Sequence, residues 1–515
     1  MKVEQKKILV IPMCGIGKRF KEEGFVDHKS MIKVNHLTML ERIINNFQNF
    51  SINFEIYLIT TKSIFNLFNF KDDWQSIESK INVIFISDHK LGPAYSIYKS
   101  FSEIPKGLGT FISYCDITWE WKNGMQINED TNAAIYCHYG FHPHLVKNNY
   151  SAFCRPSKKN KKKLNQIKEK ESYSDDWMNE PLSIGLFYVK DISLIRFSLE
   201  KMIKDNIKVS NEFFPSLVFN YLVESKINVD LIPVESFVHY GTPAQLNDIK
   251  KWCNYFFDNK KGTIEKSNIN LFPATIYTSG EGNRMKRISK KSKALIKVGE
   301  KKMIELIFEK LPLKNHELSI VYNSLDVPIK DLSIQTNYIK IDPTKSQFES
   351  LYNSAEHIST QNNFFLCSCD CFGFFDNQLL SELIEKNIHD IICFGFLPSL
   401  MQEKLECSFS TFSNSNLKLE RIFVKDVNKY SNFGLAGFFW IRDGNLFSKY
   451  LKEFNEISVV KNRELIIDDV LEFCIKKDLS IGNIPLKQYI HLGTEEEYKE
   501  YEYWDQKINS LLKSK

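Results

Sequence analysis

The chain has 515 residues, which is too long for one hydrophobic core and suits two domains of about 250 residues each. Hydrophobic residues make up 43% and charged residues 25%, as in ordinary globular proteins, and no apolar run approaches the roughly 20 residues that span a bilayer. The net charge of +5 is too small to indicate a nucleic-acid-binding surface, so we expect no nucleic acid partner. From the short apolar runs we expect a cytoplasmic protein without membrane insertion.

Strand-like and helix-like segments alternate from the N-terminus onward. In chain order, the predicted segments are 8–13 (strand), 39–50 (helix), 54–60 (strand), 81–86 (strand), 94–101 (helix) and 110–114 (strand). This alternation is typical of an α/β fold with a mainly parallel sheet. Ligands of such sheets bind beyond the carboxyl ends of the strands. Because Gly15, Gly17 and Asp116 closely follow apolar strands, we expect them at one edge of the sheet.

One set of short motifs occurs twice, in the same order and with nearly constant spacing. The glycine-rich segment 14–19 returns at 279–284, and the other paired residues are Lys29 and Lys293, Asp116 and Asp370, Gly185 and Gly437, and His239 and His491. Ordered repetition on this scale indicates a duplicated domain. We predict a first domain at 1–258, a polar linker at 259–268 and a second, more divergent domain at 269–515.

The glycine-rich segment has a direct chemical interpretation. Gly15 and Gly17 allow backbone N–H groups to approach phosphate oxygens closely, and the guanidinium of Arg19 supplies a planar, charged fork for the same oxygens. Such a segment is as typical of a structural turn as of a site, and no Gly-Lys-Ser/Thr follows that would make it a Walker A loop. The basic run 155–171 is either a solvated loop or a lid over a polyphosphate.

The first copy resembles a known family. Segments 11–20, 24–25 and 28–32 resemble the signature of sugar-phosphate nucleotidyltransferases, a Gly-x-Gly-x-Arg-Phe turn followed by Pro-Lys-Pro-Leu, with the lysine kept as Lys29 and the prolines lost. Later segments resemble the branch of that family associated with capsule and lipopolysaccharide gene products, namely 114–116, 140–144, 169–171, 211–214 and 241–243. The likeness covers nearly all of residues 5–257, and the second copy resembles the same fold with weaker motifs.

The resemblance implies two tandem nucleotidyltransferase-type domains, each with a Rossmann-like, mainly parallel mixed sheet. The implied reaction joins a nucleoside triphosphate to a sugar 1-phosphate, or to a related phosphorylated polyol, with Mg²⁺ as the cofactor. A phosphate oxygen attacks the α-phosphorus and pyrophosphate leaves, so the site needs fixed cations more than a general base. The biological setting that the resemblance implies is the synthesis of surface polysaccharides.

The resemblance also implies roles for individual residues. The catalytic residues would be Arg19, Lys29, Asp116 and Lys170; the first two would neutralise the β- and γ-phosphates and Lys170 would contact the acceptor phosphate. The nucleotide would be bound by Met13, Gly15, Gly17 and Gly92 and, in the second copy, by Gly280, Gly282, Arg284 and Lys293. The metal would be held by Asp116 and by Asp370. The sugar would be contacted by Glu169 through a hydroxyl and given room by Gly185.

Three histidines of the first copy depart from the family pattern or stand out in it. His239 stands where several members have a second metal-binding aspartate. Because imidazole is a poor ligand for Mg²⁺, either Asp116 suffices or the metal site is altered. His142 and His144 flank a proline, and they either contact the substrate or have no special role.

The second copy keeps the charged residues less completely. Lys425 is the expected equivalent of Lys170, but Val424 stands where the first copy has an acid. This leaves open whether the second copy has an active site of its own.

Two other functions stay open. A nucleotide-sugar-dependent glycosyltransferase has a related fold, but it typically uses a metal-binding Asp-x-Asp that neither 116–118 nor 370–372 provides. The second alternative is a nucleotide-binding regulatory or scaffold protein with one inactive copy. The base, the sugar and the oligomeric state, a homo-oligomer included, are not decided by these residues.

Overall fold

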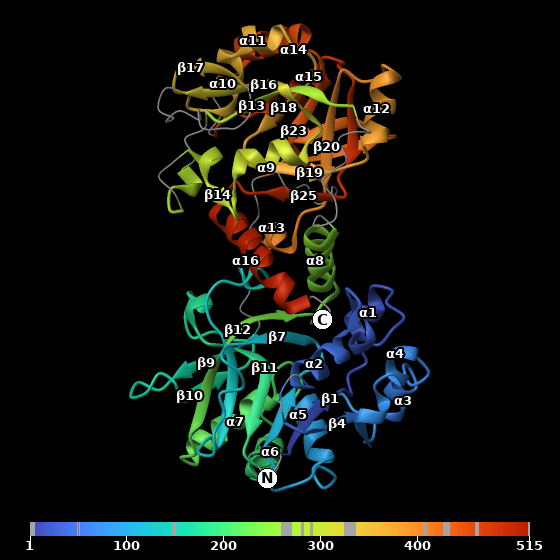
Figure 1. Cartoon of the computed structure of the whole chain (residues 1–515), viewed down its shortest axis with the longest axis vertical. Helices are drawn as coiled ribbons and strands as arrows, with labels where there is room; N and C mark the ends of the chain where they lie inside the picture. The colour runs from blue at the N-terminus through green and yellow to red at the C-terminus, as the bar shows by residue number, and fades with distance from the viewer. Residues whose placement is uncertain are drawn as a thin grey trace. The chain divides into compact units, whose positions relative to one another are not determined.

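The structure is a computed structural model. It describes residues 6–48, 50, 52–146, 151–258, 270–279, 283–288, 292–323, 336–404, 409–425, 433–458 and 463–512. The chain divides into two compact units, of which the first comprises Met1–Cys253 with Gln506–Lys515 and the second comprises Asn254–Asp505 (Figure 1).

This division differs from the predicted domains at the boundary between them and at the C-terminus. Residues directly after Cys253 belong to the second unit, where the hydroxyl of Tyr255 lies 3.1 Å from that of Tyr501. The C-terminal residues belong to the first unit, where Lys507 Nζ pairs with Glu235 at 2.9 Å. The predicted linker at 259–268 lies outside the described residues.

The first unit is built on a mixed sheet in the order β5-β4-β1-β6-β11-β8-β12-β7, with the β9–β10 hairpin beside β11. Its strands are β1 (Lys7–Pro12), β2 (Lys33–Val34), β3 (Leu37–Thr38), β4 (Phe54–Thr60), β5 (Ile81–Phe85), β6 (Thr110–Ser113), β7 (Ile117–Trp121), β8 (Ala133–His138), β9 (Ala152–Pro156), β10 (Leu164–Lys168), β11 (Leu182–Val189) and β12 (Val229–His239). Its helices are α1 (Lys18–Glu22), α2 (Met39–Gln48), α3 (Lys62–Phe65), α4 (Asp72–Gln75), α5 (Pro93–Lys99), α6 (Arg196–Lys204), α7 (Pro215–Glu224) and α8 (Pro243–Cys253).

Both faces of this sheet are covered. Alternate residues of β1 enter two different hydrophobic cores: Ile8 and Val10 join one with residues of α5, α6 and α7, whereas Leu9 and Ile11 join the other with residues of α2. A strand buried on both faces reads as a continuous apolar run, which is why 8–13 shows no polar alternation. β5, β4, β1 and β6 are parallel neighbours, so the loops that follow β1 and β6 lie at one sheet edge.

The second unit has a sheet in the order β17-β16-β13-β18-β23-β20-β24-β22-β21. Its strands are β13 (Phe272–Tyr277), β14 (Lys297–Val298), β15 (Lys301–Lys302), β16 (Leu313–Asn323), β17 (Thr336–Ile341), β18 (Asn362–Ser368), β19 (Cys371–Phe374), β20 (Ile391–Phe396), β21 (Thr411–Ser415), β22 (Lys418–Phe423), β23 (Gly434–Asp443), β24 (Ile481–Pro485) and β25 (Gln488–His491). Its helices are α9 (Met303–Lys310), α10 (Gln347–Asn353), α11 (Ala355–Ser359), α12 (Asn377–Glu385), α13 (Leu400–Lys404), α14 (Gly444–Ile457) and α15 (Ile467–Lys476). It also contains the first part of α16 (Glu495–Leu512), whose residues from Gln506 onward belong to the first unit.

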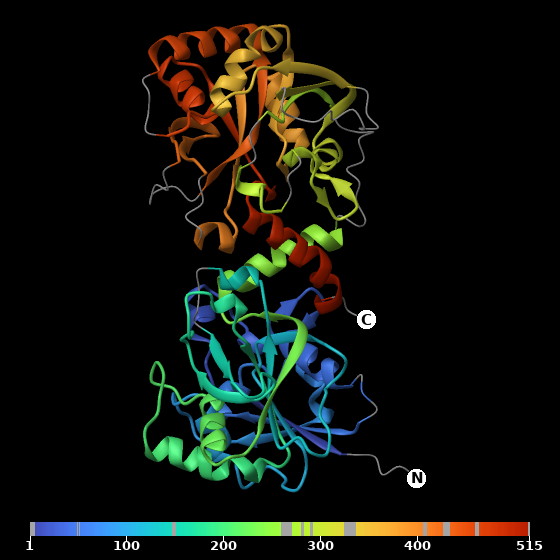
Figure 2. The same cartoon turned by 90° about the vertical axis from the view of Figure 1, so that its left-hand side faces the viewer.

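One face of the second sheet packs against a group of four helices. Residues of α10, α11, α14 and α15 share a hydrophobic core with residues of β18, β20 and β23. Figure 2 shows these gold to orange-red helices together at the top of the view. The second unit therefore has a hydrophobic core of its own.

The two units repeat one order of strands. Each begins with four parallel strands, continues with a strand antiparallel to both of its neighbours, β11 or β23, and then adds a parallel pair. The long β12 of the first unit corresponds to β24 and β25 of the second. In the matching pairs, Ile117 lies opposite His239 and Cys371 lies opposite His491. The predicted α/β class, with mixed sheets, is confirmed.

Among the described residues, none of the helices combines the length and the apolar character that crossing a membrane requires.

Candidate functional site

The glycine-rich loop follows β1 at the carboxyl edge of the first sheet. Gly17 adopts the left-handed conformation, with φ 64° and ψ 43°, and precedes α1; glycine takes this conformation without strain. A β-carbon at Gly17 would lie 3.7 Å from that of Lys29, so the loop packs directly against the next motif. Gly15 and Arg19 are exposed, which leaves this loop accessible to an anion.

A lysine and an aspartate from distant motifs meet at the same edge. Lys29 Nζ donates to Asp116 Oδ2 at 2.8 Å across 87 residues of sequence. Asp116 follows β6 and is 7% exposed. Burial would raise the pKa of Asp116, but the charge of Lys29 opposes burial, His239 adds to this effect when its ring is protonated, and the pKa falls to about 2. Burial would lower the pKa of Lys29, and the charge of Asp116 raises it instead. Both side chains are therefore charged at neutral pH.

His239 is the third member of this cluster. It ends β12, and its Nε2 lies 3.9 Å from Asp116 Oδ2, which is too long for a hydrogen bond. The ring lies against the backbone of Gly241, where an added β-carbon would be 2.3 Å from Cε1. Burial lowers the pKa of His239; Asp116 opposes this effect, and the charges of Lys29 and Arg19 reinforce it. The imidazole is therefore neutral at pH 7.

His28 connects the glycine-rich loop to the turn that carries Lys29, and sequence motifs gave it no role. Its Nε2 donates to the Gly15 carbonyl at 2.8 Å, and its Nδ1 accepts from the backbone N–H of Ser30 at 3.4 Å. The side chain is 2% exposed, and burial lowers its pKa to about 4, so the ring is neutral. The signal that would have found it is the histidine directly before Lys29, where the family has proline.

Glu169 and Lys170 lie in the turn after β10. Lys170 has a left-handed backbone, with φ 57°, which is uncommon outside glycine, and its ammonium lies 4.9 Å from the centre of the Phe214 ring. Glu169 accepts a hydrogen bond from the hydroxyl of Ser216 on α7. Burial raises the pKa of Glu169 to about 7, against the opposing effects of Ser216 and Lys170. Glu169 therefore changes its charge near neutral pH, as groups at functional sites often do.

The other predicted contacts of the nucleotide and sugar have structural reasons of their own. Met13 is 1% exposed, and its backbone N–H and carbonyl are bonded to Ile59 and Thr60, so its contact with a nucleotide stays a prediction. Gly92 has φ 86°, and a β-carbon there would lie 2.8 Å from the Phe213 carbonyl oxygen. Gly185 also has φ 86°, and a β-carbon there would lie 2.3 Å from Tyr114 Cδ2. Packing alone requires glycine at both positions, and their contacts with nucleotide or sugar stay predictions.

His142 and His144 are buried and have protein partners, and their contact with substrate stays a prediction. Each side chain is 1% exposed. His142 Nε2 lies 3.2 Å from the Phe237 carbonyl, and His144 Nε2 lies 3.0 Å from Asp248 Oδ2. These bonds tie their loop to β12 and α8, so burial explains both histidines structurally.

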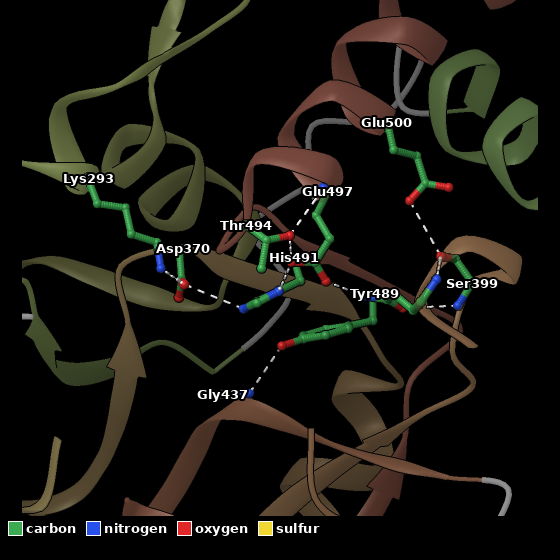
Figure 3. A network of polar contacts seen from close by, with 10 residues as sticks. Lys293, Asp370, Ser399, Gly437, Tyr489, His491, Thr494, Glu497 and Glu500 are labelled. Atoms are coloured by element: carbon green, nitrogen blue, oxygen red, sulfur yellow. Dashed lines mark hydrogen bonds and ion pairs between the residues drawn. The ribbon is translucent and has the colours of Figure 1, made fainter. Parts of the chain in front are cut away.

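The second unit brings together the equivalent charged residues. Lys293 Nζ pairs with Asp370 Oδ2, and His491 Nε2 lies 3.4 Å from the same oxygen (Figure 3). Arg284 is exposed. Gly280 and Gly282, predicted to bind nucleotide, lie outside the described residues.

The acid that is missing before Lys425 reappears on a helix. Lys425 has φ 49°, the same unusual backbone as Lys170, which supports their equivalence. Asp468 on α15 occupies the position equivalent to Ser216 on α7, and it accepts a hydrogen bond from Ser410. Burial raises its pKa to about 6, whereas the Ser410 hydrogen bond and the charge of Lys425 act to lower it. The first unit thus has its acid in the turn and its hydroxyl on the helix, and the second unit has its acid on the helix.

The donor sets of the two units differ in how well they suit a divalent metal. Among the described residues, no group of three or more His, Cys, Asp or Glu side chains is arranged to hold a metal by itself. Mg²⁺ often uses one or two carboxylates together with substrate phosphates and water, and Asp116 fits that arrangement. Asp370 does not fit it, because its Oδ2 is paired with both Lys293 and His491.

Comparisons with known proteins reach only part of the chain. No family model and no curated protein matches the sequence. Among solved structures, a nucleoside-diphosphate-sugar pyrophosphorylase from Vibrio cholerae RC9 is 16% identical over 47% of this chain and 99% of its own, with a TM-score of 0.39. A putative glucose-1-phosphate thymidylyltransferase from Bacillus anthracis is 16% identical over 46% of this chain and 96% of its own, with a TM-score of 0.37.

An inositol-1-phosphate CTP transferase from T. maritima is similar to the same extent. It is 12% identical over 48% of this chain and 98% of its own, with a TM-score of 0.37. Each of these proteins corresponds to about half of the chain. Similarities of this strength do not identify a reaction, so the function is inferred from the residues of the site.

Proposed function

We propose that the first unit is a nucleotidyltransferase that joins a nucleoside triphosphate to a sugar 1-phosphate, or to a related phosphorylated polyol, and releases pyrophosphate. The observation that supports this most is the Lys29–Asp116 ion pair beside the Gly15–Gly17 loop. These residues come from separate motifs, yet they meet at the carboxyl edge of parallel strands, where ligands of α/β sheets bind.

The charges of the site suit the proposed reaction. An oxygen of the sugar phosphate forms a bond to the α-phosphorus while the bond between that phosphorus and the β-phosphate oxygen breaks, so negative charge accumulates on the leaving pyrophosphate. The guanidinium of Arg19 and the ammonium of Lys29 would stabilise that charge, and backbone N–H groups at Gly15 and Gly17 would bind phosphate oxygens. Mg²⁺ at Asp116 would supply further positive charge to the phosphates.

The acceptor would be bound by the turn after β10. Lys170 would pair with its phosphate, and the carboxylate of Glu169 would accept a hydrogen bond from a hydroxyl of the sugar or polyol. The hydrogen bond from Ser216 to Glu169 supports this assignment because it fixes the orientation of the carboxyl group. We further propose that the product serves surface polysaccharide synthesis, as the motif resemblance implies.

The test is a matrix of reactions with the full-length protein and Mg²⁺, in which each nucleoside triphosphate is combined with a panel of sugar and polyol phosphates. We expect one combination to yield pyrophosphate and a nucleotide-linked product, both identified by mass spectrometry. Release of a nucleoside diphosphate from a nucleotide sugar would indicate a glycosyltransferase instead. Nucleotide binding without pyrophosphate release from any combination would favour a regulatory or scaffold protein.

A further inference from the structure

The surroundings of His239 and His491 differ at one matching position of the helix that follows each histidine. Each histidine ends a strand, is followed two residues later by a glycine against which the ring packs, and precedes a threonine that accepts the N–H of the first helical turn. The residue whose N–H is bound in this way is Gln245 in the first unit and Glu497 in the second. This local arrangement is the same in both units, and at this position of the helix the side chain differs.

Glu497 clamps His491 from the side opposite Asp370. His491 Nδ1 lies 2.6 Å from Glu497 Oε2, while its Nε2 lies 3.4 Å from Asp370 Oδ2 (Figure 3). Nδ1 must carry a hydrogen to bond the Glu497 carboxylate, and Nε2 faces a second carboxylate, so the ring lies between two anions that favour its imidazolium form. Burial would lower the pKa of His491, but the charges of Glu497 and Asp370 outweigh burial and raise it to about 10.

The clamp itself is fixed by neutral groups. Glu497 is 4% exposed, and it accepts hydrogen bonds from Thr494 Oγ1 at 2.8 Å and from Gln402 Nε2 at 2.9 Å. A buried carboxylate with this many donors keeps its charge and its position. His491 is therefore held as a fixed cation within the fold.

Asp370 is consequently neutralised twice. The ammonium of Lys293 and the imidazolium of His491 both face its Oδ2, and the residue is 6% exposed. A divalent cation at this carboxylate would have to displace one fixed cation and lie beside the other, which Coulomb repulsion opposes strongly where solvent is excluded.

The first unit has no such clamp. Among the described residues, Asp116 is the one acid within 4.0 Å of the His239 ring, and its Oδ2 is 3.9 Å away. Gln245 forms its contact with the hydroxyl of Thr242, at 3.2 Å. Asp116 thus faces one strongly bound cation, Lys29, where Asp370 faces two.

We propose that the second unit is a metal-free copy in which the clamped His491 stands where the first unit admits a divalent cation, and that residue 245 or 497 decides between the two states. The chain then carries one metal site, at Asp116. The part of this inference that concerns Asp116 rests on the proposed function of the first unit, and the part that concerns Asp370 does not.

The test is anomalous diffraction from crystals of the full-length protein soaked with Mn²⁺ and pyrophosphate, which locates the metal directly. We expect an anomalous peak at Asp116 and none at Asp370 in the wild type. In Glu497→Gln, which gives the second unit the residue of the first, we expect a peak to appear at Asp370. The reciprocal Gln245→Glu variant should lose the peak at Asp116.

The results at Asp116 and at Asp370 test the claims for the two units separately. A peak at Asp370 in the wild type would overturn the inference, and so would the lack of one in Glu497→Gln. If no peak appears at Asp116 in the wild type, the metal role proposed for the first unit fails, and the inference for the second unit is still decided by Asp370 in the wild type and in Glu497→Gln. Because glutamine has nearly the shape of glutamate and occurs naturally at 245, the variant keeps the contacts of the helix turn.

Discussion

The first and second units differ most in the charges around matching positions of one scaffold. His239 is neutral beside Asp116, whereas His491 is an imidazolium between Asp370 and Glu497. The strand order and the glycine against which the ring packs are the same in both units. The comparison teaches that a retained motif does not guarantee retained chemistry, because a neighbour outside the motif sets the charge of its histidine.

The acids beside Lys170 and Lys425 are the opposite case, because a residue of the motif is lost in the second unit while a carboxyl is still found near the lysine. The first unit has Glu169 in the turn and Ser216 on the helix, and the second unit has Val424 in the turn and Asp468 on the helix. A comparison of sequences records the loss of an acid at 424. The structure shows a buried carboxyl, that of Asp468, which acts electrostatically on Lys425, so both units have an acid near the lysine but at different positions.

The largest effect is expected from replacing the two aspartates. Asp116→Asn should lower kcat for pyrophosphate release by about 10²–10³-fold, because it removes the proposed metal carboxylate and leaves Lys29 without its partner. Asp370→Asn should leave kcat within about twofold, because the second unit is proposed to hold no metal. Steady-state kinetics of both purified variants checks the pair. Equal losses in the two variants would mean that both units contribute to one activity.

A smaller effect is expected from moving the acid within the first unit. Glu169→Val should lower kcat/KM for the acceptor phosphate by about 10–100-fold, as loss of a hydrogen bond to a charged group typically does. Adding Ser216→Asp reproduces the arrangement of the second unit. It should recover about half or more of the transition-state stabilisation lost in Glu169→Val, measured as kcat/KM for the acceptor phosphate. A Ser216→Ala change in the same background is the control. If Ser216→Asp restores no more of the lost kcat/KM than Ser216→Ala does, the carboxyls of Glu169 and Asp468 are not equivalent.

Much of the fold could be predicted from the sequence. The predicted strand at 8–13 corresponds to β1, the one at 54–60 to β4, and the one at 110–114 to β6. These strands are buried on both faces, so their apolar runs carry a clear signal. The partition of the C-terminus could not be predicted, because the pairing of Lys507 with Glu235 depends on where the end of α16 lies and leaves no pattern in the sequence.

The site was partly predictable for a similar reason. The proximity of Lys29 and Asp116 follows from two loops at one sheet edge, which the motifs reveal. The clamp on His491 and the relocated acid Asp468 are contacts between residues on different elements, and one sequence gives no register for them. The burial of His142 and His144 could not be predicted, because a polar residue in a loop is usually exposed, whereas this loop packs on β12 and α8.

The pH dependence of the first unit should report Glu169. Its pKa in the folded protein is about 7, above the value of about 4.3 expected for an unfolded chain. As a hydrogen-bond acceptor it acts as the carboxylate, so kcat/KM for the acceptor should rise about tenfold per pH unit below 7 and level off above it. Glu169→Gln should lack this inflection. An unchanged profile in that variant would assign the inflection to another group.

The same shift has a consequence for stability. Because the folded pKa is raised, the folded state binds the proton more tightly, and the stabilisation present below about pH 4.3 is lost as pH rises through 7. The free energy of unfolding of Glu169→Gln, relative to the wild type, should therefore be higher at pH 8 than at pH 5. Urea denaturation at the two pH values measures this difference.

The smallest effect is expected at His28, which differs from its counterpart Ser292. His28 caps the turn that carries Lys29 and donates to the Gly15 carbonyl at 2.8 Å, whereas Ser292 makes no side-chain cap in the second unit. His28→Ala leaves the Gly15 carbonyl without this donor and should raise KM for the nucleotide about 3–10-fold, with kcat little changed, because the loop loses a support rather than a reacting group.

Ser292→Ala is the matched control for His28→Ala, and it should change neither KM nor stability measurably. His28→Asn and His28→Gln provide shorter and longer donors, and partial recovery of KM by either would show that the hydrogen bond to Gly15 carries the effect. If kcat falls as much as KM rises in His28→Ala, then the turn positions Lys29 for the transition state as well, and His28 acts through the Lys29–Asp116 pair instead of the loop.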